Sequence, residues 1–295
     1  MITVMGARGH VGNKIAHFLL DDGLPVRALG RSARTLDDLA ERGAEVQECD
    51  LLDTTRLSEL LHEGSALFAM VPSNPFTENY SAEQDRFGAS IASAISVSKV
   101  PTVVTLSSLG ADRLDAPGVI GALHRQEARL RALTGVRVTA LRPVSFFENL
   151  LAAVDQLVQQ GSHVDSIVSD LPIPMISTSD IAAAAAHALV DPDWDGYVVR
   201  ELLGERDVSY IEATTILGRH LGITDPRYVQ LPYADMASVL TTIGFSLEYS
   251  HHYVDMTRAF NSGELTEPVP RTSANTTATS IEAFAASLSV AGSPS

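Results

Sequence analysis

Several residue types are scarce in this sequence, and each scarcity excludes a class of protein. Cys49 is the only cysteine among 295 residues, so the chain can form neither an internal disulfide nor a cysteine-based zinc site. We expect a buried thiol at this position. No run of apolar residues in the sequence reaches the roughly 18 to 20 residues of a membrane-spanning helix. We therefore expect a water-soluble protein that has no membrane partner.

Basic residues are scarce as well. Lysine and arginine together number 21 against 36 acidic residues, which gives a formal net charge of −15 and a pI near 4.9. A chain with this charge repels phosphate backbones, so nucleic acid is a poor candidate partner. Met1 to Met5 run directly into a glycine turn, which leaves no room for a secretory signal. We therefore expect a cytoplasmic location.

Short β-type runs alternate with helical stretches through the first half of the chain. The runs are 2–5, 25–29, 45–49, 66–71, 102–106 and 136–141, and the helical stretches are 11–22, 33–42, 54–61, 82–99 and 123–134. Alternation at this spacing is typical of βαβ units. The predicted fold class is therefore α/β, with a doubly wound parallel sheet of the Rossmann type.

The pattern changes after Pro143 and becomes mostly helical. A short apolar segment lies at 171–175, and an alanine-rich helix begins near Asp180, which we expect to cap that helix. We predict a Rossmann domain over residues 1–150, to which about 176–192 return. Residues 151–295 are predicted to form a smaller, mostly helical substrate-binding region, with an amphipathic stretch at 281–288 and mobile last residues.

The first predicted strand ends in a glycine-rich turn that opens a helix. Its residues are Gly6, Ala7, Arg8, Gly9, His10, Val11 and Gly12. In this context the first glycine allows a tight turn, the second lets a pyrophosphate approach the backbone, and the third lets helix and strand pack closely. The helix N-terminus offers free N–H groups to the phosphates. We predict that all seven residues bind a dinucleotide; an ordinary glycine loop is the alternative.

The position that selects between NAD and NADP lies about 20 residues beyond the glycine turn. An acidic residue there accepts hydrogen bonds from the ribose hydroxyls in NAD-selective folds. Here the chain reads Gly-Arg-Ser-Ala-Arg, with Arg31 and Arg34 and no carboxylate before Asp37. Two guanidinium groups favour a ribose 2′-phosphate. The predicted cofactor is NADP(H), although both arginines could also be solvated residues at a helix entry.

Several motifs together resemble the NmrA-like family, which comprises atypical members of the short-chain dehydrogenase/reductase superfamily. They are the turn 6–12, Arg31, Asp50-Leu51, Leu141-Arg142-Pro143, the stretch 146–150, Ser179-Asp180-Ile181-Ala182, Asp191-Pro192, the stretch 201–204 and the stretch 260–263. The resemblance spans almost the whole chain. It implies an NADP-binding core with a smaller C-terminal substrate region. It also implies either an NADPH-dependent reductase of quinones, dyes or enones, or a protein that binds the nucleotide without turnover and senses redox state.

The resemblance also implies further site residues by position. Asp50 and Leu51 border the adenine; Val71, Pro72 and Ser73 line the cofactor; Ser107 and Ser108 lie beside the nicotinamide; Pro143, Phe146, Phe147 and Asn149 form the nicotinamide wall, the last two facing the substrate. Several of these residues have ordinary structural roles as alternatives. Asp50 could cap a strand end, and Pro72 could end a strand. Ser107 and Ser108 could only satisfy local backbone groups, and the phenylalanines could pack in the core.

The catalytic pair of ordinary short-chain dehydrogenases is missing. In that pair, Tyr-x-x-x-Lys, the lysine lowers the tyrosine pKa. No tyrosine here has a lysine four residues later, and Lys14 and Lys99 are the only lysines. His124, in the predicted helix before Leu141-Arg142-Pro143, is the remaining candidate proton donor, because imidazole titrates near neutral pH. A surface or cofactor-positioning histidine is the alternative.

Other chemistries lack their motifs, and an aromatic helix suggests the substrate. The chain has no Gly-x-Ser-x-Gly elbow, and His251-His252 lacks a matching ligand pattern, so we expect no metal. Tyr249 and Tyr253 lie on a predicted amphipathic helix, which could line a substrate pocket or only pack in the core.

We predict an NADPH-dependent reductase of a planar, apolar quinone-like or conjugated carbonyl compound. It acts as a monomer or homodimer and is suited to a tailoring step in specialised metabolism. A non-catalytic NADP(H) sensor is the alternative.

Overall fold

The computed structural model describes residues 1–265 and 269–288. The chain divides into two compact units. Unit 1 comprises residues 1–116, 120–143 and 181–201, and unit 2 comprises 117–119, 144–180 and 202–295. The sequence predicts the boundary of the first domain at 150 and its returning segment at about 176–192, whereas unit 1 has its boundary at 143 and its returning segment at 181–201. The predicted mobility of the last residues concerns positions 289–295, which lie outside the described residues.

Unit 1 is built on a seven-stranded sheet with the order β10-β6-β5-β4-β1-β2-β3. The strands are β1 (Ile2–Val4), β2 (Val26–Gly30), β3 (Glu45–Glu48), β4 (Ala66–Ala69), β5 (Thr102–Leu106), β6 (Arg137–Pro143) and β10 (Tyr197–Leu202). Each pairing from β3 through β6 is parallel. The predicted doubly wound α/β sheet is therefore confirmed, and β10 is an additional strand that the sequence analysis did not predict.

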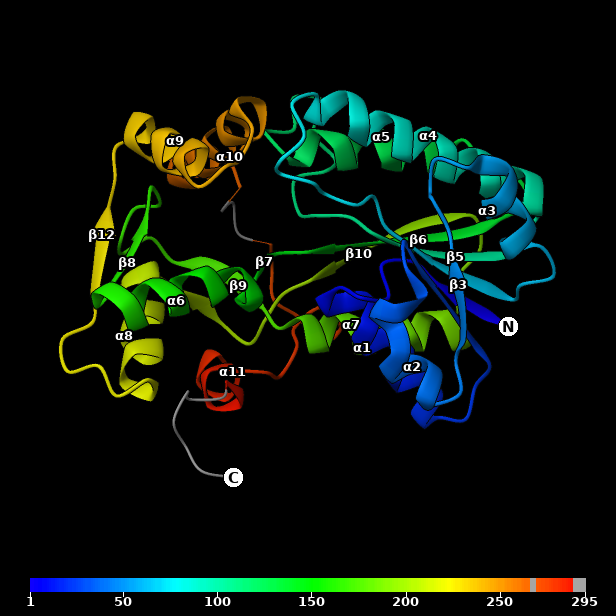
Figure 1. Ribbon diagram of the computed structural model, residues 1–295, viewed down its shortest axis with the longest axis horizontal. Helices are drawn as coiled ribbons and strands as arrows, with labels where there is room; N and C mark the ends of the chain where they lie inside the picture. The colour runs from blue at the N-terminus through cyan, green and yellow to red at the C-terminus, as the bar shows by residue number, and fades with distance from the viewer. Residues whose placement is uncertain (266–268, 289–295) are drawn as a thin grey trace. The chain divides into compact units, whose positions relative to one another are not determined.

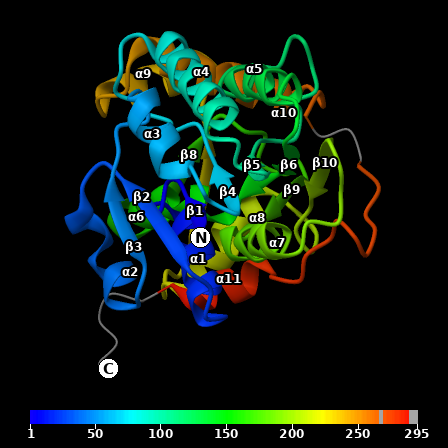
Figure 2. The ribbon, with the colours of Figure 1, turned by 90° about the vertical axis from the view of Figure 1, so that its right-hand side faces the viewer.

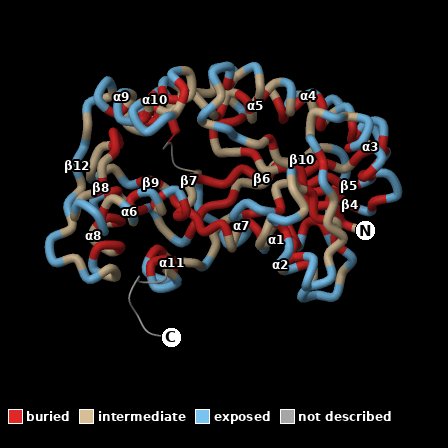
Figure 3. Tube along the Cα trace, viewed as in Figure 1, coloured by how far each residue is buried: buried red, intermediate tan, exposed pale blue. Residues whose placement is uncertain are grey.

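Helices cover both faces of this sheet (Figures 1 and 2). One face carries α3 (Thr54–Leu61), α4 (Tyr80–Ser98) and α5 (Ile120–Arg131), and the other carries α1 (His10–Asp21), α2 (Asp37–Glu41) and α7 (Thr178–Val190). A short 3-10 helix, η1 (Ala33–Leu36), precedes α2. Because both faces are covered, the central strands read as continuous apolar runs. All four residues of β4 are buried, as Figure 3 shows for the middle of the sheet.

Unit 2 contains two small sheets and six helices among its described residues. One sheet has the order β11-β9-β7, and the other pairs β12 with β8. The strands are β7 (Ser145–Phe146), β8 (Ser162–Asp165), β9 (Ile173–Ile176), β11 (Asp207–Val208) and β12 (Arg227–Gln230). The helices are η2 (Phe147–Leu150), α6 (Leu151–Gln160), α8 (Tyr210–His220), α9 (Tyr233–Thr242), α10 (Leu247–Asn261) and α11 (Ile281–Ser287).

Asp180 does not cap α7, contrary to the sequence-based expectation. The helix begins at Thr178, so Asp180 lies in its first turn. The Asp180 carboxylate accepts hydrogen bonds from the backbone N–H and the hydroxyl of Thr279, at 3.1 and 2.6 Å. It therefore ties the segment before α11 to the start of α7.

In the described part of the chain, none of the helices has the length and apolar character that crossing a membrane requires.

Candidate active site

The glycine turn between β1 and α1 has the geometry of a phosphate-binding loop. Gly6 has φ +63°, and its carbonyl accepts the Gly9 N–H at 2.8 Å. Gly9 is the N-cap of α1 and provides no side-chain cap, so the first N–H groups of the helix are available to an anion. Arg8, Gly9 and His10 are exposed. The accessible part of the turn is therefore the segment 8–10 at the helix start.

Gly12 is buried where the helix meets the turn. A Cβ at this position would lie 2.4 Å from the carbonyl oxygen of Gly6 and 2.8 Å from that of Met5. Only glycine fits without moving the backbone of the turn. Ala7 and Val11 are also buried, so their side chains pack in the core and only their main chain can contribute to a ligand site.

Arg31 follows β2 directly, and Arg34 lies in η1. Both side chains are exposed, and among the described residues neither guanidinium has a carboxylate partner. Glu48, at the end of β3, accepts the backbone N–H of Ala33 at 2.9 Å. The sequence analysis missed this carboxylate because Glu48 lies 17 residues beyond Arg31 in the sequence. Only the pairing of Gly30 with Glu48 brings it to the start of η1.

The other predicted cofactor residues follow strand ends of unit 1. Asp50 is exposed after β3, and its carboxylate accepts the Leu52 N–H at 2.9 Å, while Leu51 is half-buried. After β4, Val71 is buried, Pro72 accepts a hydrogen bond from the Gln84 amide, and the Ser73 hydroxyl lies 3.1 Å from that of Tyr80. Because parallel strands end at the same edge of a sheet, these segments share the edge with the glycine turn.

Ser107, which follows β5, belongs to a buried charged cluster. Its hydroxyl donates to Oε1 of Glu127 at 2.5 Å. Arg142 in β6 donates to both oxygens of the same carboxylate, at 2.8 and 2.6 Å, and Tyr197 donates to Oε2 at 2.9 Å. The hydrogen bonds from Arg142 and Ser107 hold the pKa of Glu127 below its usual range although burial alone raises it. Ser108 is half-buried and donates to the Leu109 carbonyl.

This cluster was not found from the sequence. Glu127, Arg142 and Ser107 are 3%, 7% and 4% exposed, and charged residues at such burial need partners. Their spacing of 15 and 20 positions carries no periodic signal. Only the presence of an arginine inside an apolar strand pattern, Ala-Leu-Arg-Pro-Val, could have indicated a buried partner.

His124 is half-buried on α5, with Nδ1 2.9 Å from the carbonyl oxygen of Ala111. A carbonyl can only accept, so Nδ1 carries the proton. In the neutral imidazole Nε2 is then an acceptor, and the ring can donate from Nε2 only as the imidazolium. His124 is thus fixed in orientation, and acting as an acid would require its doubly protonated form.

The predicted residues of the nicotinamide wall and substrate side differ widely in burial. Pro143 is buried at the end of β6, and Phe146 is half-buried in β7. Phe147 is 1% exposed and stacks on Phe284 with ring centroids 5.5 Å apart. Its side chain therefore packs in the core of unit 2, and we leave it out of the proposed substrate site. Asn149 is exposed.

Tyr249 and Tyr253 both lie on α10. Tyr249 packs edge-on against Phe245, with ring centroids 5.4 Å apart, and is half-buried. The Tyr253 hydroxyl donates to the Asp165 carboxylate at 2.6 Å, and burial raises the tyrosine pKa. A substrate-binding role for either tyrosine stays a prediction.

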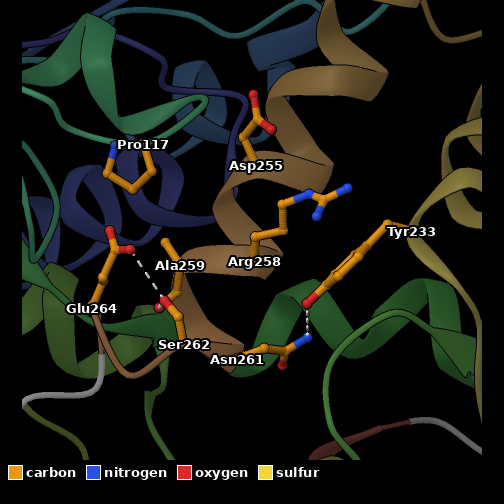
Figure 4. A pocket seen from close by; sticks show the side chains of 8 residues that line it. All are labelled: Pro117, Tyr233, Asp255, Arg258, Ala259, Asn261, Ser262 and Glu264. Atoms are coloured by element: carbon orange, nitrogen blue, oxygen red, sulfur yellow. Dashed lines mark hydrogen bonds between the residues drawn. The ribbon is translucent and has the colours of Figure 1, made fainter.

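Unit 2 contains a cavity of about 400 Å³ beside the C-terminal part of α10. Figure 4 shows that Arg258 reaches toward Tyr233 and that Asn261 bonds to the Tyr233 hydroxyl. The guanidinium carbon lies 4.1 Å from the centroid of the tyrosine ring. None of the four predicted substrate residues is among those that line this cavity: Pro117, Tyr233, Asp255, Arg258, Ala259, Asn261, Ser262 and Glu264.

A buried polar cluster surrounds His163 in unit 2. His163 is 4% exposed, and burial lowers the pKa of its imidazole to about 4. Its Nδ1 donates to the Thr214 hydroxyl at 2.9 Å, because that hydroxyl gives its own proton to the Tyr210 carbonyl. The ring packs against Tyr210 and Tyr228.

We expect acid to destabilise the protein through His163. Its pKa is near 6.5 when unfolded and about 4 when folded, so the unfolded state binds more protons between these values. The contribution of the neutral imidazole to the free energy of unfolding is fully present above about pH 6.5. It decreases as the pH falls, by about 2 kcal/mol between about pH 7 and pH 5. Urea unfolding at the two pH values measures this loss.

The matched variant is His163→Phe, which keeps the aromatic packing and removes the titration. Its free energy of unfolding should decrease less than that of the wild type between the same pH values. Burial raises the pKa of Asp165, which opposes the effect of His163 in both proteins and cancels in the comparison. Equal pH dependence in the two proteins would contradict the assignment.

Within the described ranges, no group of three or more His, Cys, Asp or Glu side chains is arranged to hold a metal ion.

Comparisons with known proteins show which chains this one resembles. A model of the NmrA-like family matches residues 1–286. A (4-alkanoyl-5-oxo-2,5-dihydrofuran-3-yl)methyl phosphate reductase from Streptomyces griseus is 30% identical, over 75% of this chain and 74% of its own length. An NAD(P)H azoreductase from Xenophilus azovorans is 25% identical, over 83% of this chain and 82% of its own length. The structure of an NADPH-dependent quinone oxidoreductase from Escherichia coli, solved with NADPH, superposes with a TM-score of 0.79 at 22% identity. The match covers 97% of this chain and 98% of the other.

Proposed function

Because the chain belongs to the NmrA-like family, we propose that it is an NADPH-dependent reductase that transfers hydride to a quinone-like, azo or conjugated carbonyl compound. The observation that carries this proposal is the open backbone turn at Gly6–Gly12, with Arg31 at the end of the neighbouring strand. The curated relatives reduce a furan phosphate ester or act as an azoreductase. A tailoring step in specialised metabolism is compatible with both.

The cofactor that fits this turn is NADP(H). The N–H groups at the start of α1 would hold the pyrophosphate, and the guanidinium groups of Arg31 and Arg34 would hold the 2′-phosphate. Glu48 accepts a backbone N–H beside them. Bound NADPH supplies a hydride from its nicotinamide ring.

The residues near the end of β5 provide little acid–base chemistry. The single proton of the Ser107 hydroxyl is committed to Glu127, and an ionised carboxylate can only accept. Ser107 therefore cannot donate to a substrate oxygen while this bond persists. A hydride acceptor that delocalises the resulting negative charge needs no proton donor in the transition state. The site is therefore suited to quinones and extended conjugated systems rather than to simple ketones.

Replacing Arg31 with alanine should weaken NADPH binding selectively. The lost hydrogen bonds to a charged phosphate are worth about 1.5 to 3 kcal/mol, whereas NADH has no 2′-phosphate and should bind almost unchanged. Fluorescence titration with both nucleotides measures the difference. Arg42→Ala is the matched control, since Arg42 is also exposed but pairs with Asp21. Equal losses for NADPH and NADH would show that Arg31 does not bind the 2′-phosphate.

Replacing His124 with alanine should leave most of the single-turnover rate intact. The ring is held by Ala111 and donates to a substrate only as the imidazolium, and a conjugated acceptor takes hydride without it. Stopped-flow oxidation of bound NADPH measures this rate. A decrease of about 100-fold to 10,000-fold, the effect of removing a positioned acid, with normal folding and NADPH affinity, would make His124 catalytic.

Turnover separates the reductase from a non-catalytic sensor, because the two share the fold and the nucleotide. Purified protein should oxidise NADPH faster than the protein-free control with at least one compound from a panel of quinones, azo dyes and triphenylmethane dyes. Tight NADPH binding without oxidation in the presence of any of them would favour the sensor.

A further inference from the structure

The segment 107–112, which follows β5 and carries Ser107 and Ser108, is attached at several points to its surroundings in unit 1. Its backbone bonds to β6 through Ser107 N–H to Leu141 O, at 2.8 Å, and through Leu109 N–H to Pro143 O, at 3.0 Å. These bonds continue the ladder between β5 and β6 past the end of the strand. They fix where the segment leaves the sheet but not how it bends afterwards.

Three side-chain contacts fix the remainder. Glu127 accepts the Ser107 hydroxyl at 2.5 Å, His124 donates to the Ala111 carbonyl at 2.9 Å, and Arg142 Nη1 lies 3.5 Å from the Asp112 carboxylate. Glu127 and His124 are three residues apart on α5 and therefore lie on the same face of the helix. The two ends of the segment are thus held by one helix face and one strand.

The carboxylate of Glu127 connects Ser107 with Arg142 and Tyr197. Each of its oxygens accepts two hydrogen bonds, from Ser107 and Arg142 at Oε1 and from Arg142 and Tyr197 at Oε2. All the strong acceptor positions of the carboxylate are used, and the pair is almost completely buried. A buried ion pair is often no more stabilising than well-packed apolar residues of similar volume. Stability alone therefore does not account for a charge at this place.

We propose that Glu127 and Arg142 are positioning residues for hydride transfer, which act by holding the segment 107–112 in the conformation that receives the nicotinamide. This inference rests on the proposed function. Glu127 orients the Ser107 hydroxyl and fixes α5, and Arg142 connects that carboxylate to Asp112 at the far end of the segment. Neither residue touches the substrate. Without them the fold persists, but the nicotinamide is held in a less defined orientation.

The test removes the charges without leaving one of them unpaired. The double variant Glu127→Leu, Arg142→Met keeps similar side-chain volumes and leaves no buried charge unpaired. The hydroxyl groups of Ser107 and Tyr197 lose their acceptor, so its urea midpoint should decrease, but by much less than that of Glu127→Ala. Its single-turnover rate at saturating NADPH should fall by about 10-fold to 100-fold, as expected for a misplaced reactant. The fluorescence of bound NADPH, which reports the nicotinamide environment, should lose its enhancement.

Asp85→Asn is the matched control. Asp85, on α4, pairs with Arg125 and Arg129 of α5, the helix that carries Glu127, at 2.7 and 2.8 Å, but it has no contact with the segment 107–112 among the interactions that the structure describes. This variant should keep both the rate and the nicotinamide fluorescence. A general loosening of α5 would affect it as much as the double variant, and that outcome would overturn the proposal.

Three further outcomes bear on the proposal. If the double variant folds and keeps the wild-type rate and fluorescence, the ion pair is only structural and the proposal is wrong. If it does not fold, Ser107→Ala with Asp112→Asn removes two contacts of the segment and leaves the ion pair intact, and the same two readouts then decide. Should the wild type show no turnover, the proposed function fails, while the fluorescence of bound NADPH still tests whether Glu127 and Arg142 position the nicotinamide.

Discussion

Gly12→Ala should abolish useful binding of both NADPH and NADH. The added Cβ would lie 2.4 Å from Gly6 O and 2.7 Å from Gly6 C, and both are backbone atoms, so no side chain can rotate away. Relief requires moving the turn itself, whose N–H groups are the proposed pyrophosphate ligands. We expect both dissociation constants to increase by at least about 100-fold, or about 2.7 kcal/mol. Fluorescence titration with each nucleotide measures this.

The control for this variant is Gly23→Ala, which separates binding from stability. Gly23 has φ +72° and no atom within 4 Å of an added Cβ, so alanine there costs about 1 to 2 kcal/mol of backbone strain without changing the turn. Nucleotide affinity should remain that of the wild type. If Gly12→Ala bound both nucleotides normally while folded, the turn would not be the pyrophosphate site.

Glu127→Ala should give the largest loss of stability among the single substitutions considered. It leaves the Arg142 guanidinium, 7% exposed, without its bidentate partner, and an unpaired buried charge costs about 3 to 5 kcal/mol. The hydroxyl groups of Ser107 and Tyr197 lose their acceptor at the same time. Urea unfolding at neutral pH measures the decrease in the free energy of unfolding.

Asp85→Ala provides the comparison for that loss. Asp85 pairs with Arg125 and Arg129 of α5, the helix that also carries Glu127, but its carboxylate is 41% exposed, and exposed pairs are worth about 0 to 1 kcal/mol. A decrease of the same size in both variants would mean that burial of the Glu127 pair has no special energetic consequence.

Much of unit 1 could be predicted from the sequence because its signals are local. Thr54–Leu61 and Thr102–Leu106 occur with the predicted bounds, since apolar periodicity and turn residues mark both. The glycine turn is equally local: three glycines between a strand and a helix suffice to define it. The strand β10 escaped prediction because Tyr197–Leu202 is half-buried with arginine and glutamate in it, and only pairing with β6 makes it a strand.

The contacts between distant residues could not be predicted in the same way. Glu48 reaches Ala33 through the register of β2 and β3, and Glu127 meets Ser107 across 20 residues. Neither spacing forms a pattern that can be recognised in a single sequence. Phe147 illustrates the opposite difficulty: its place beside a functional motif suggested a ligand contact, whereas its ring packs on Phe284 in the core. From the sequence alone, an apolar side chain near a site can equally be a ligand contact or part of the core, and only its burial distinguishes the two roles.

Deuterium transfer from labelled NADPH to a triphenylmethane dye tests the central claim most directly. The reduced dye carries the transferred atom on its central carbon, where it does not exchange with water, so mass spectrometry of the product detects it. Under anaerobic single-turnover conditions, NADPH deuterated at one of the two C4 positions should yield a deuterated product, and the other isomer an unlabelled one. A product without deuterium from either isomer, or NADPH that binds and is never oxidised by dye, quinone or azo compound, would contradict direct hydride transfer by this protein.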